Sequence, residues 1–178
     1  LPLGAVLARA GEGVPQQLLH PHARARVALP DVEPRDLRAV GLPHVLAERD
    51  EESGLLNGVA LRAMIPALHT ELARSLSAGH FPFVYGADCS VLLAAIPAWR
   101  EPGETPGLVF IDGHEDATPM ERSPDGEAAN MEIAILLGTT GDRLPPPLRQ
   151  AHGALDPAAL AMLGPHDEAW RCPIGGGS

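Results

Sequence analysis

Three metal-capable side chains follow an apolar run near the middle of the chain. The run Leu108–Ile111 ends in Asp112, His114 and Asp116, which occupy every second position. Alternate residues of an extended chain point to the same face, so Asp112 and His114 are expected to converge, and Asp116, just past the strand end, can complete the set. Carboxylate oxygens and one imidazole suit Mn²⁺, Fe²⁺ or Zn²⁺. The pattern indicates a metal pocket at the carboxyl end of a strand, and the alternative is an acidic loop after a buried strand.

A second stretch upstream repeats this design. Phe81–Tyr85 is predicted to be a short apolar strand, and after a glycine turn Asp88 and Cys89 open an apolar helix. If the two strands are neighbours in a parallel sheet, their carboxyl ends bring Cys89 beside Asp112. Asp88 and Ser90 are interpreted as turn and cap groups, because no histidine lies near them in the sequence.

The two stretches and a third one downstream resemble the ureohydrolase superfamily, which includes arginase, agmatinase and formimidoylglutamase. The segments are Gly86-Ala-Asp-Cys-Ser90, Asp112-Gly-His-Glu-Asp116 and Ala129-Asn-Met-Glu-Ile-Ala134. The family patterns are Gly-Gly-Asp-His-Ser, Asp-Ala-His-x-Asp and Gly-Asn-x-His-Gly, in the same order and strand context. The resemblance covers residues 57 to 167, and the later Ser-x-Asp-x-Asp motif of the family has no match in this sequence.

The resemblance implies an α/β fold with three α/β/α layers and a mostly parallel sheet, of which the C-terminal part is missing. Residues 1–171 would form a single, partial arginase-like domain, and 172–178 resemble a linker. The alternation of helix and strand patterns also favours parallel pairing with right-handed crossovers. We expect helices over 57–78, 89–98 and 130–137, and strands over 81–85, 108–112 and 160–163. Further upstream, the patterns predict strands over 1–7 and 24–29 and a helix over 34–40.

The same resemblance implies a metal-dependent hydrolase of linear amidines or guanidines. In the family, a hydroxide held by two Mn²⁺ ions attacks the amidine carbon, and urea or an analogous product leaves. Asp112 would bridge both ions, Cys89 and Asp116 would bind one ion, and His114 would bind the other.

Two positions depart from the family patterns. Cys89 stands where the family has a histidine ligand, and a thiolate favours Zn²⁺ or Fe²⁺ over Mn²⁺. Glu132 stands where the family has a proton-shuttling histidine, and it can act with Asp116 as a catalytic group if burial raises its pKa. A surface or helix-capping role for Glu132 is the alternative. By analogy, Asn130 would face the carboxylate end of the substrate.

Two other hypotheses explain the same residues. Cys89 precedes an apolar helix, whose N-terminus lowers a thiol pKa, so it can be a nucleophile with His114 as its base and without a metal. The second hypothesis is a catalytically inactive arginase-like protein with a structural or regulatory role, because Cys89, Glu132 and the missing aspartate pair depart from the family site.

The composition limits the classes of partner that the protein is expected to bind. A formal net charge of −10 argues against nucleic-acid binding and favours cationic small substrates such as guanidines. Two cysteines, Cys89 and Cys172, give no disulfide framework, so a cytoplasmic setting is expected. No stretch of the sequence approaches the length of a membrane span, so no membrane partner is expected. By resemblance, the protein is expected to be a homo-oligomer.

Overall fold

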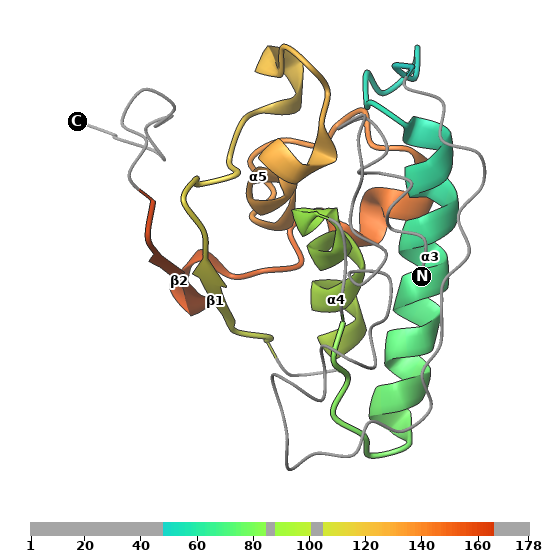
Figure 1. The fold of residues 1–178 in the computed structure, drawn as a ribbon, viewed down its shortest axis with the longest axis vertical. Coiled ribbons are helices and arrows are strands. Elements are labelled where there is room, and N and C mark those ends of the chain that lie inside the picture. The colour runs from blue at the N-terminus through green and yellow to red at the C-terminus, as the bar shows by residue number, and fades with distance from the viewer. Residues whose placement is uncertain (1–47, 85–87, 101–104, 166–178) are drawn as a thin grey trace, which may run out of the picture.

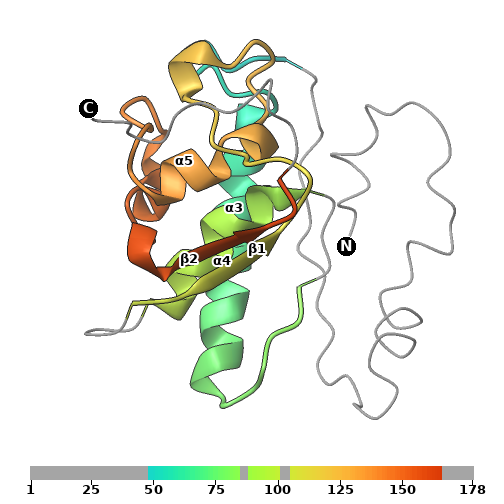
Figure 2. The ribbon, with the colours of Figure 1, turned by 90° about the vertical axis from the view of Figure 1, so that its left-hand side faces the viewer.

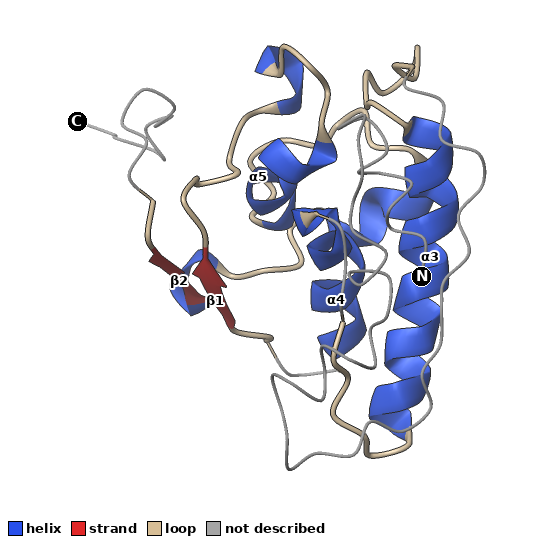
Figure 3. Cartoon of the chain, in the orientation of Figure 1, coloured by secondary structure: helices blue, strands red, loops and turns tan. Residues whose placement is uncertain are grey.

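Among the residues that the structure describes, three helices lie on one side of a two-stranded parallel sheet. The computed structural model describes residues 48–84, 88–100 and 105–165. Figures 1 and 2 show the strands on one side of the helices, and Figure 3 marks the long loops between them. The helices and strands are α3 (Gly58–Ser77), α4 (Leu92–Trp99), β1 (Leu108–Ile111), α5 (Glu132–Leu136) and β2 (Leu160–Leu163). Short 3-10 helices cover Cys89–Val91, Met120–Arg122, Ala128–Asn130, Pro146–Ala151 and Pro157–Ala159.

The long helix α3 confirms the prediction made from its apolar periodicity. Its buried side chains recur at helical spacing, and Pro66 lies inside it without dividing it. Gly79 has a φ of 72° and follows the last turn, so it ends the helix as expected. Asn57 occupies the N-terminal cap position with a left-handed backbone, and its side chain makes no capping hydrogen bond to the helix.

The sheet confirms the predicted parallel pairing. Leu108 pairs with Leu160 and Ile111 with Leu163, while Phe110 points into the core. The outward side chains stay exposed: Val109, Ile111 and Leu163 are 63%, 74% and 53% accessible. Within the described ranges, helices therefore cover one face of a small parallel sheet, and the predicted third layer is not among these residues.

The strand predicted over 81–85 is wrong for the residues that the structure describes. Residues 81–84 carry no strand pairing, and Phe81 and Phe83 are 88% and 54% exposed. Apolar and aromatic residues suit a pleated surface, but a strand also needs a neighbour that accepts and donates its backbone hydrogen bonds. β1 pairs with β2 and not with this segment. Tyr85 lies outside the described residues.

The helix expected over 130–137 is shorter than predicted. A 3-10 turn precedes it, and Met131 has a φ of −142°, so the regular helix begins at Glu132. It ends as expected, because Gly138 has a φ of 74° and its N–H bonds to the carbonyl of Ile135. α5 is consequently a single buried turn that presents Glu132 at its first position.

The hydrophobic core lies between the helices and the inner face of the sheet. α3 packs along α4, and the 3-10 helix Pro146–Ala151 packs against both. Leu93, Ile135 and Leu148 are completely buried there. No helix in the described part of the chain is long and apolar enough to cross a membrane. The strands predicted over 1–7 and 24–29, the helix predicted over 34–40 and the tail 172–178 lie outside the described residues.

Candidate metal centre

Cys89 is positioned by a capped turn that leads into α4. Asp88 is the N-terminal cap of the 3-10 helix Cys89–Val91, and its Oδ1 accepts hydrogen bonds from the Ser90 N–H at 2.9 Å and from the Ser90 hydroxyl. Ser90 is 2% exposed. Asp88 and Ser90 are thus cap groups, as predicted, and they direct the half-buried Cys89 thiol toward the end of β1.

Asp112 continues the ladder just beyond β1. Its N–H donates to the Leu163 carbonyl at 3.2 Å, and its Oδ2 lies 3.9 Å from Cys89 Sγ. A Cβ at Gly164, whose φ is 102°, would lie 2.7 Å from the Asp112 carbonyl oxygen. The end of β2 therefore passes so close to Asp112 that glycine is required there, and the predicted proximity of Cys89 and Asp112 is confirmed.

Asp116 is held by backbone contacts with the segment that carries Glu132. Its φ of 46° lies in the left-handed region, which Asp tolerates better than most residues. Its carbonyl accepts from the Ile133 N–H at 3.0 Å, and the Thr118 N–H donates to the Asn130 carbonyl at 3.0 Å. These two hydrogen bonds join the loop after β1 to the start of α5, so Asp116 and Glu132 are brought together by the backbone.

Glu132 is completely buried. Its exposed fraction is 0%, and neither carboxylate oxygen has a hydrogen-bond partner among the described residues. Burying a carboxylate without a donor is unfavourable unless the group is protonated or paired with a cation. The alternative interpretation of Glu132 as a surface or helix-capping residue is therefore wrong.

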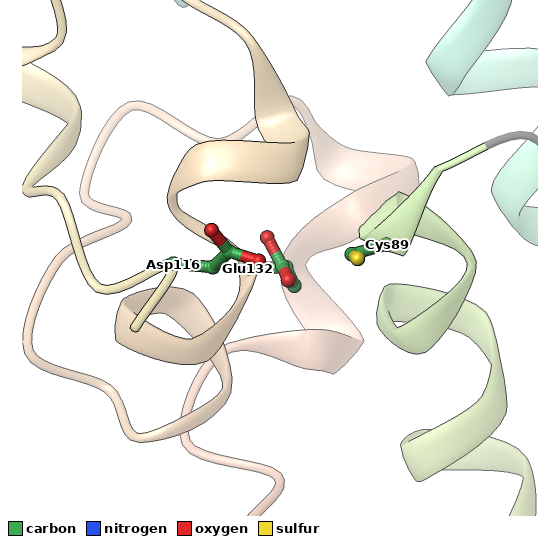
Figure 4. A group of neighbouring side chains, drawn as sticks. All are labelled: Cys89, Asp116 and Glu132. Atoms are coloured by element: carbon green, nitrogen blue, oxygen red, sulfur yellow. The ribbon is translucent and has the colours of Figure 1, made fainter. Parts of the chain in front are cut away.

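Three side chains from three separate segments meet at one point. Ligand atoms of Cys89, Asp116 and Glu132 all lie within 4.8 Å of one another. Figure 4 shows the two carboxylates and the thiol pointing toward a common space between α4, α5 and the loop after β1. We call these three residues the buried cluster. Sequence reasoning missed the membership of Glu132, because burial of the first turn of α5 has no signature in the motif.

Asp112 and His114 form a separate, more exposed pair. The Asp112 Oδ1 accepts from the His114 backbone N–H at 3.0 Å, and His114 Nδ1 lies 3.6 Å from the same oxygen. The His114 side chain is 64% exposed. Of the four predicted metal ligands, the structure thus places Cys89 and Asp116 in the buried cluster, Asp112 beside Cys89, and His114 at the rim.

Crowded acidic groups raise the pKa values in the buried cluster. Burial, followed by repulsion from Asp116, raises the pKa of Glu132 to about 10. Burial also raises the pKa of Asp116, and the neighbouring Glu132 carboxyl, which can donate to Asp116 only when it is protonated, opposes this rise. The pKa of the Cys89 thiol rises to about 12 through burial and then through the nearby carboxylates, first Glu132. Near neutral pH the Glu132 carboxyl and the Cys89 thiol of the metal-free protein therefore hold protons that a bound cation would displace.

The same environment argues against the nucleophilic cysteine hypothesis. A nucleophilic thiol needs a lowered pKa, yet that of Cys89 is raised to about 12 by burial and carboxylates. The predicted base, His114, faces Asp112 instead. The turn at Cys89 is a three-residue 3-10 helix, too short for a helix N-terminus to offset four carboxylates.

A pocket of about 250 Å³ opens beside the buried cluster, with Asp116 in its wall. Glu115, Asp125 and Asn130 also line it. Although burial opposes ionisation, hydrogen bonds from the Glu127 N–H, the Ser123 hydroxyl and the Asn130 amide lower the pKa of Asp125. The pocket is therefore acidic, close in size to the lower end of small-molecule sites, roughly 300 Å³, and suited to a cation.

Sequence comparison connects this geometry with known enzymes. An arginase of Saccharomyces cerevisiae is 27% identical over 149 residues, and one of Bacillus subtilis is 25% identical over 139 residues. These alignments cover 77% and 78% of this chain. The chain is a distant homologue of the arginases. It spans less than half the length of these two relatives, 45% and 46%, and no family model matches it.

Solved arginase structures share the fold. The Bacillus subtilis arginase superposes with a TM-score of 0.68 at 21% identity, over 85% of this chain and 50% of that one. The arginase of Entamoeba histolytica in complex with L-ornithine superposes with a TM-score of 0.60 at 20% identity, over 72% of this chain and 44% of that one. The expected arginase-like α/β architecture is thus confirmed for the part of the fold that this chain covers.

The residues of the buried cluster suit a divalent cation. The group combines two carboxylates and a thiol, and both oxygens of the buried Glu132 are unsatisfied. A divalent ion would neutralise the crowded acids and fill the coordination of these oxygens.

Proposed function

We propose that this arginase homologue is a metal-dependent hydrolase of linear amidines or guanidines. The observation that carries the proposal is the position of Asp116, which belongs to the buried cluster and also lines the acidic pocket. A cation bound by the cluster would therefore lie next to a space suited to a positively charged guanidino group. We propose Mn²⁺ from the arginase relationship, with Zn²⁺ or Fe²⁺ as alternatives because of Cys89.

The chain's own residues would bind and orient both reactants. Cys89, Asp112, His114 and Asp116 are the proposed metal ligands: Cys89 and Asp116 would bind a first ion, His114 a second, and Asp112 would contribute to both. When bound, the ion would lower the pKa of a coordinated water molecule so that a nucleophile is present near neutral pH. Glu115 and Asp125 would attract the substrate cation, and Asn130 would contact its other end. The amide nitrogen of Asn130 donates to Asp125 at 3.2 Å, which fixes the orientation of the amide in the pocket wall.

In the proposed reaction, the water oxygen forms a bond to the amidine carbon and the bond from that carbon to the alkyl nitrogen breaks. A guanidinium and one water molecule give urea and an alkylammonium ion, so both protons of the water molecule move to the leaving nitrogen. Asp116 would accept these protons one at a time and pass them to the amine, because its carboxylate belongs to the cluster and also lines the pocket.

Metal analysis and a urea assay on the purified protein test the proposal. We expect about one or more divalent ions per chain and release of urea, or of its analogue, from a guanidine or amidine. Less than one ion per chain together with no product from a panel of guanidines would contradict it. Size-exclusion chromatography with light scattering tests the proposed homo-oligomer in the same preparation.

A non-catalytic arginase-like protein is the second candidate. The observation in its favour is that Cys89 and a fully buried Glu132 stand at two positions where the family patterns have histidine. Such a protein would bind the metal for stability and release no product. Metal-dependent turnover of any amidine would exclude this candidate.

A further inference from the structure

A catalytic role does not explain why Glu132 is completely buried or which groups surround it. Its side chain is 0% exposed, it does not line the acidic pocket, and neither oxygen has a hydrogen-bond partner within the described ranges. A proton-transfer group must reach the reacting atoms directly or through water. A metal ligand instead needs a fixed, desolvated carboxylate directed at other donors, and this is how Glu132 is placed (Figure 4).

The spacing of the three donors fits one ion. Donor atoms around a tetrahedral zinc ion with a thiolate and carboxylates lie about 3.6 Å apart, given bond lengths of about 2.3 Å to sulfur and 2.1 Å to oxygen. The donors of the buried cluster lie within 4.8 Å of one another, so small side-chain shifts suffice. The donors come from three segments, which Asp88 and the backbone hydrogen bonds of Asp116 hold in place.

The donor types also select the ion. Thiolate ligands favour Zn²⁺, and Mn²⁺ is the most weakly bound ion of the divalent first-row series. The His114 side chain, which would suit a second ion, is 64% exposed and does not belong to the cluster. A site with one sulfur and two carboxylates is therefore expected to prefer Zn²⁺ to Mn²⁺.

We propose that Cys89, Asp116 and Glu132 bind a single Zn²⁺ ion and that Glu132 is a ligand of this ion. This inference rests on the proposed function, in that it assumes that the cluster binds a divalent cation. It assigns Glu132 a place in the coordination sphere, and it leaves Asp116 as the carboxylate that contacts both the ion and the pocket.

Cobalt is a suitable probe, because Co²⁺ occupies zinc sites and absorbs near-ultraviolet light when a thiolate binds it. The experiment uses metal-free chain 1–178 with Cys172→Ser, so that Cys89 is the only thiol. We expect one Co²⁺ per chain with a charge-transfer band, displaced by an equal concentration of Zn²⁺ but not by Mn²⁺. Adding Cys89→Ser should abolish the band while Co²⁺ still binds more weakly.

Glu132→Gln is the decisive variant. Loss of one ligand should weaken Zn²⁺ and Co²⁺ binding by more than about 100-fold, above the roughly 10- to 100-fold effect of changing a residue that only orients a ligand. The thiolate band should return at saturating Co²⁺, because Cys89 is intact. Glu71→Gln changes a partly exposed acid on α3 that pairs with Arg74, outside the cluster and the pocket, and should leave affinity unchanged. Circular dichroism shows whether the metal-free variant is folded.

The outcomes separate this inference from the proposed function. Unchanged Zn²⁺ affinity in a folded Glu132→Gln variant would overturn the ligand role while metal binding stands. A preference for Mn²⁺ over Zn²⁺ in the parent protein would overturn the single-zinc assignment. If the parent bound no divalent ion at all, both the inference and the proposed function would fail.

Discussion

The buried cluster and the Asp112–His114 pair come from the same part of the chain, yet their surroundings differ. Glu132 is inaccessible and Asp116 is 8% exposed, whereas the His114 side chain is 64% exposed. Acids in the cluster have raised pKa values because they are buried together. In Asp112, by contrast, one carboxylate oxygen accepts a hydrogen bond from the His114 N–H. The regular D-x-H-x-D spacing therefore places its members in two different environments, and a metal site cannot be read from spacing alone.

The largest expected effect comes from removing the charge of Asp116. Asn is the suitable replacement, because it tolerates the left-handed backbone at φ 46° and keeps the shape of the side chain. Asp116→Asn should lower metal affinity by at least about 100-fold and abolish urea release, because it changes both the cluster and the pocket wall. Calorimetric titration with Zn²⁺ and Mn²⁺ measures the first effect. Affinity within threefold of the parent would show that Asp116 is not a ligand.

The stability of the metal-free protein should depend on pH because of the buried Glu132 carboxyl. The pKa of Glu132 rises from an ordinary 4.5 to about 10 on folding, so its stabilising contribution is complete below pH 4.5 and is lost as pH rises toward 10. Asp116 shifts in the same direction. The melting temperature of the metal-free protein should therefore fall between pH 5 and pH 8, by about 5 °C or more.

Glu132→Gln provides the matched control for this pH effect. Glutamine cannot ionise, and its amide can donate to the Asp116 carboxylate, so most of the fall in melting temperature between pH 5 and pH 8 should disappear. The lowered pKa of Asp125 acts at more acidic pH and does not contribute in this range. If the melting temperature of Glu132→Gln fell equally steeply between pH 5 and pH 8, the pH effect would originate outside the buried cluster.

A moderate effect is expected from restoring the histidine of the family pattern at Cys89. Cys89→His replaces a soft sulfur donor with an imidazole, so the preference for Zn²⁺ over Mn²⁺ should decrease by about tenfold. Competition titrations of the two metals against one indicator measure this ratio. A ratio that does not change would mean that the thiol does not bind the ion.

The smallest effect is expected at His114. Its imidazole is exposed and faces Asp112, so His114→Ala should change the affinity for the first ion by less than about threefold. His114→Ala is the matched comparison for Asp116→Asn, because both residues belong to the D-x-H-x-D motif. If His114→Ala lowered metal affinity as much as Asp116→Asn, the Asp112–His114 pair and the buried cluster would form one metal centre, and the contrast between them would be wrong.

The elements with regular local patterns could be predicted from the sequence. The apolar spacing of α3 and the runs that form β1 and β2 gave correct elements, because local periodicity decides which face is buried. Parallel pairing followed from the order of the elements. The predicted proximity of Cys89 Sγ and Asp112 Oδ2, 3.9 Å apart, is correct, but the sheet edge that predicted it does not form, because residues 81–84 carry no strand pairing.

The rest depends on tertiary contacts that no local pattern encodes. The missing strand at 81–84 reflects the choice of β2 as the partner of β1. The burial of Glu132 follows from Met131, which interrupts the helical backbone, and from the hydrogen bond between Ile133 and Asp116. A motif can identify Glu132 as unusual, but only the packed turn of α5 shows that it points at Cys89 and Asp116.

X-ray absorption spectroscopy of the zinc-loaded protein with Cys172→Ser tests the central claim most directly. We predict one sulfur neighbour at about 2.3 Å and oxygen neighbours at about 2.0 to 2.2 Å around a single zinc ion. The sulfur contribution should vanish in Cys89→Ser. A first coordination shell in the parent protein that contains only oxygen and nitrogen would contradict the claim that Cys89, Asp116 and Glu132 bind one ion together.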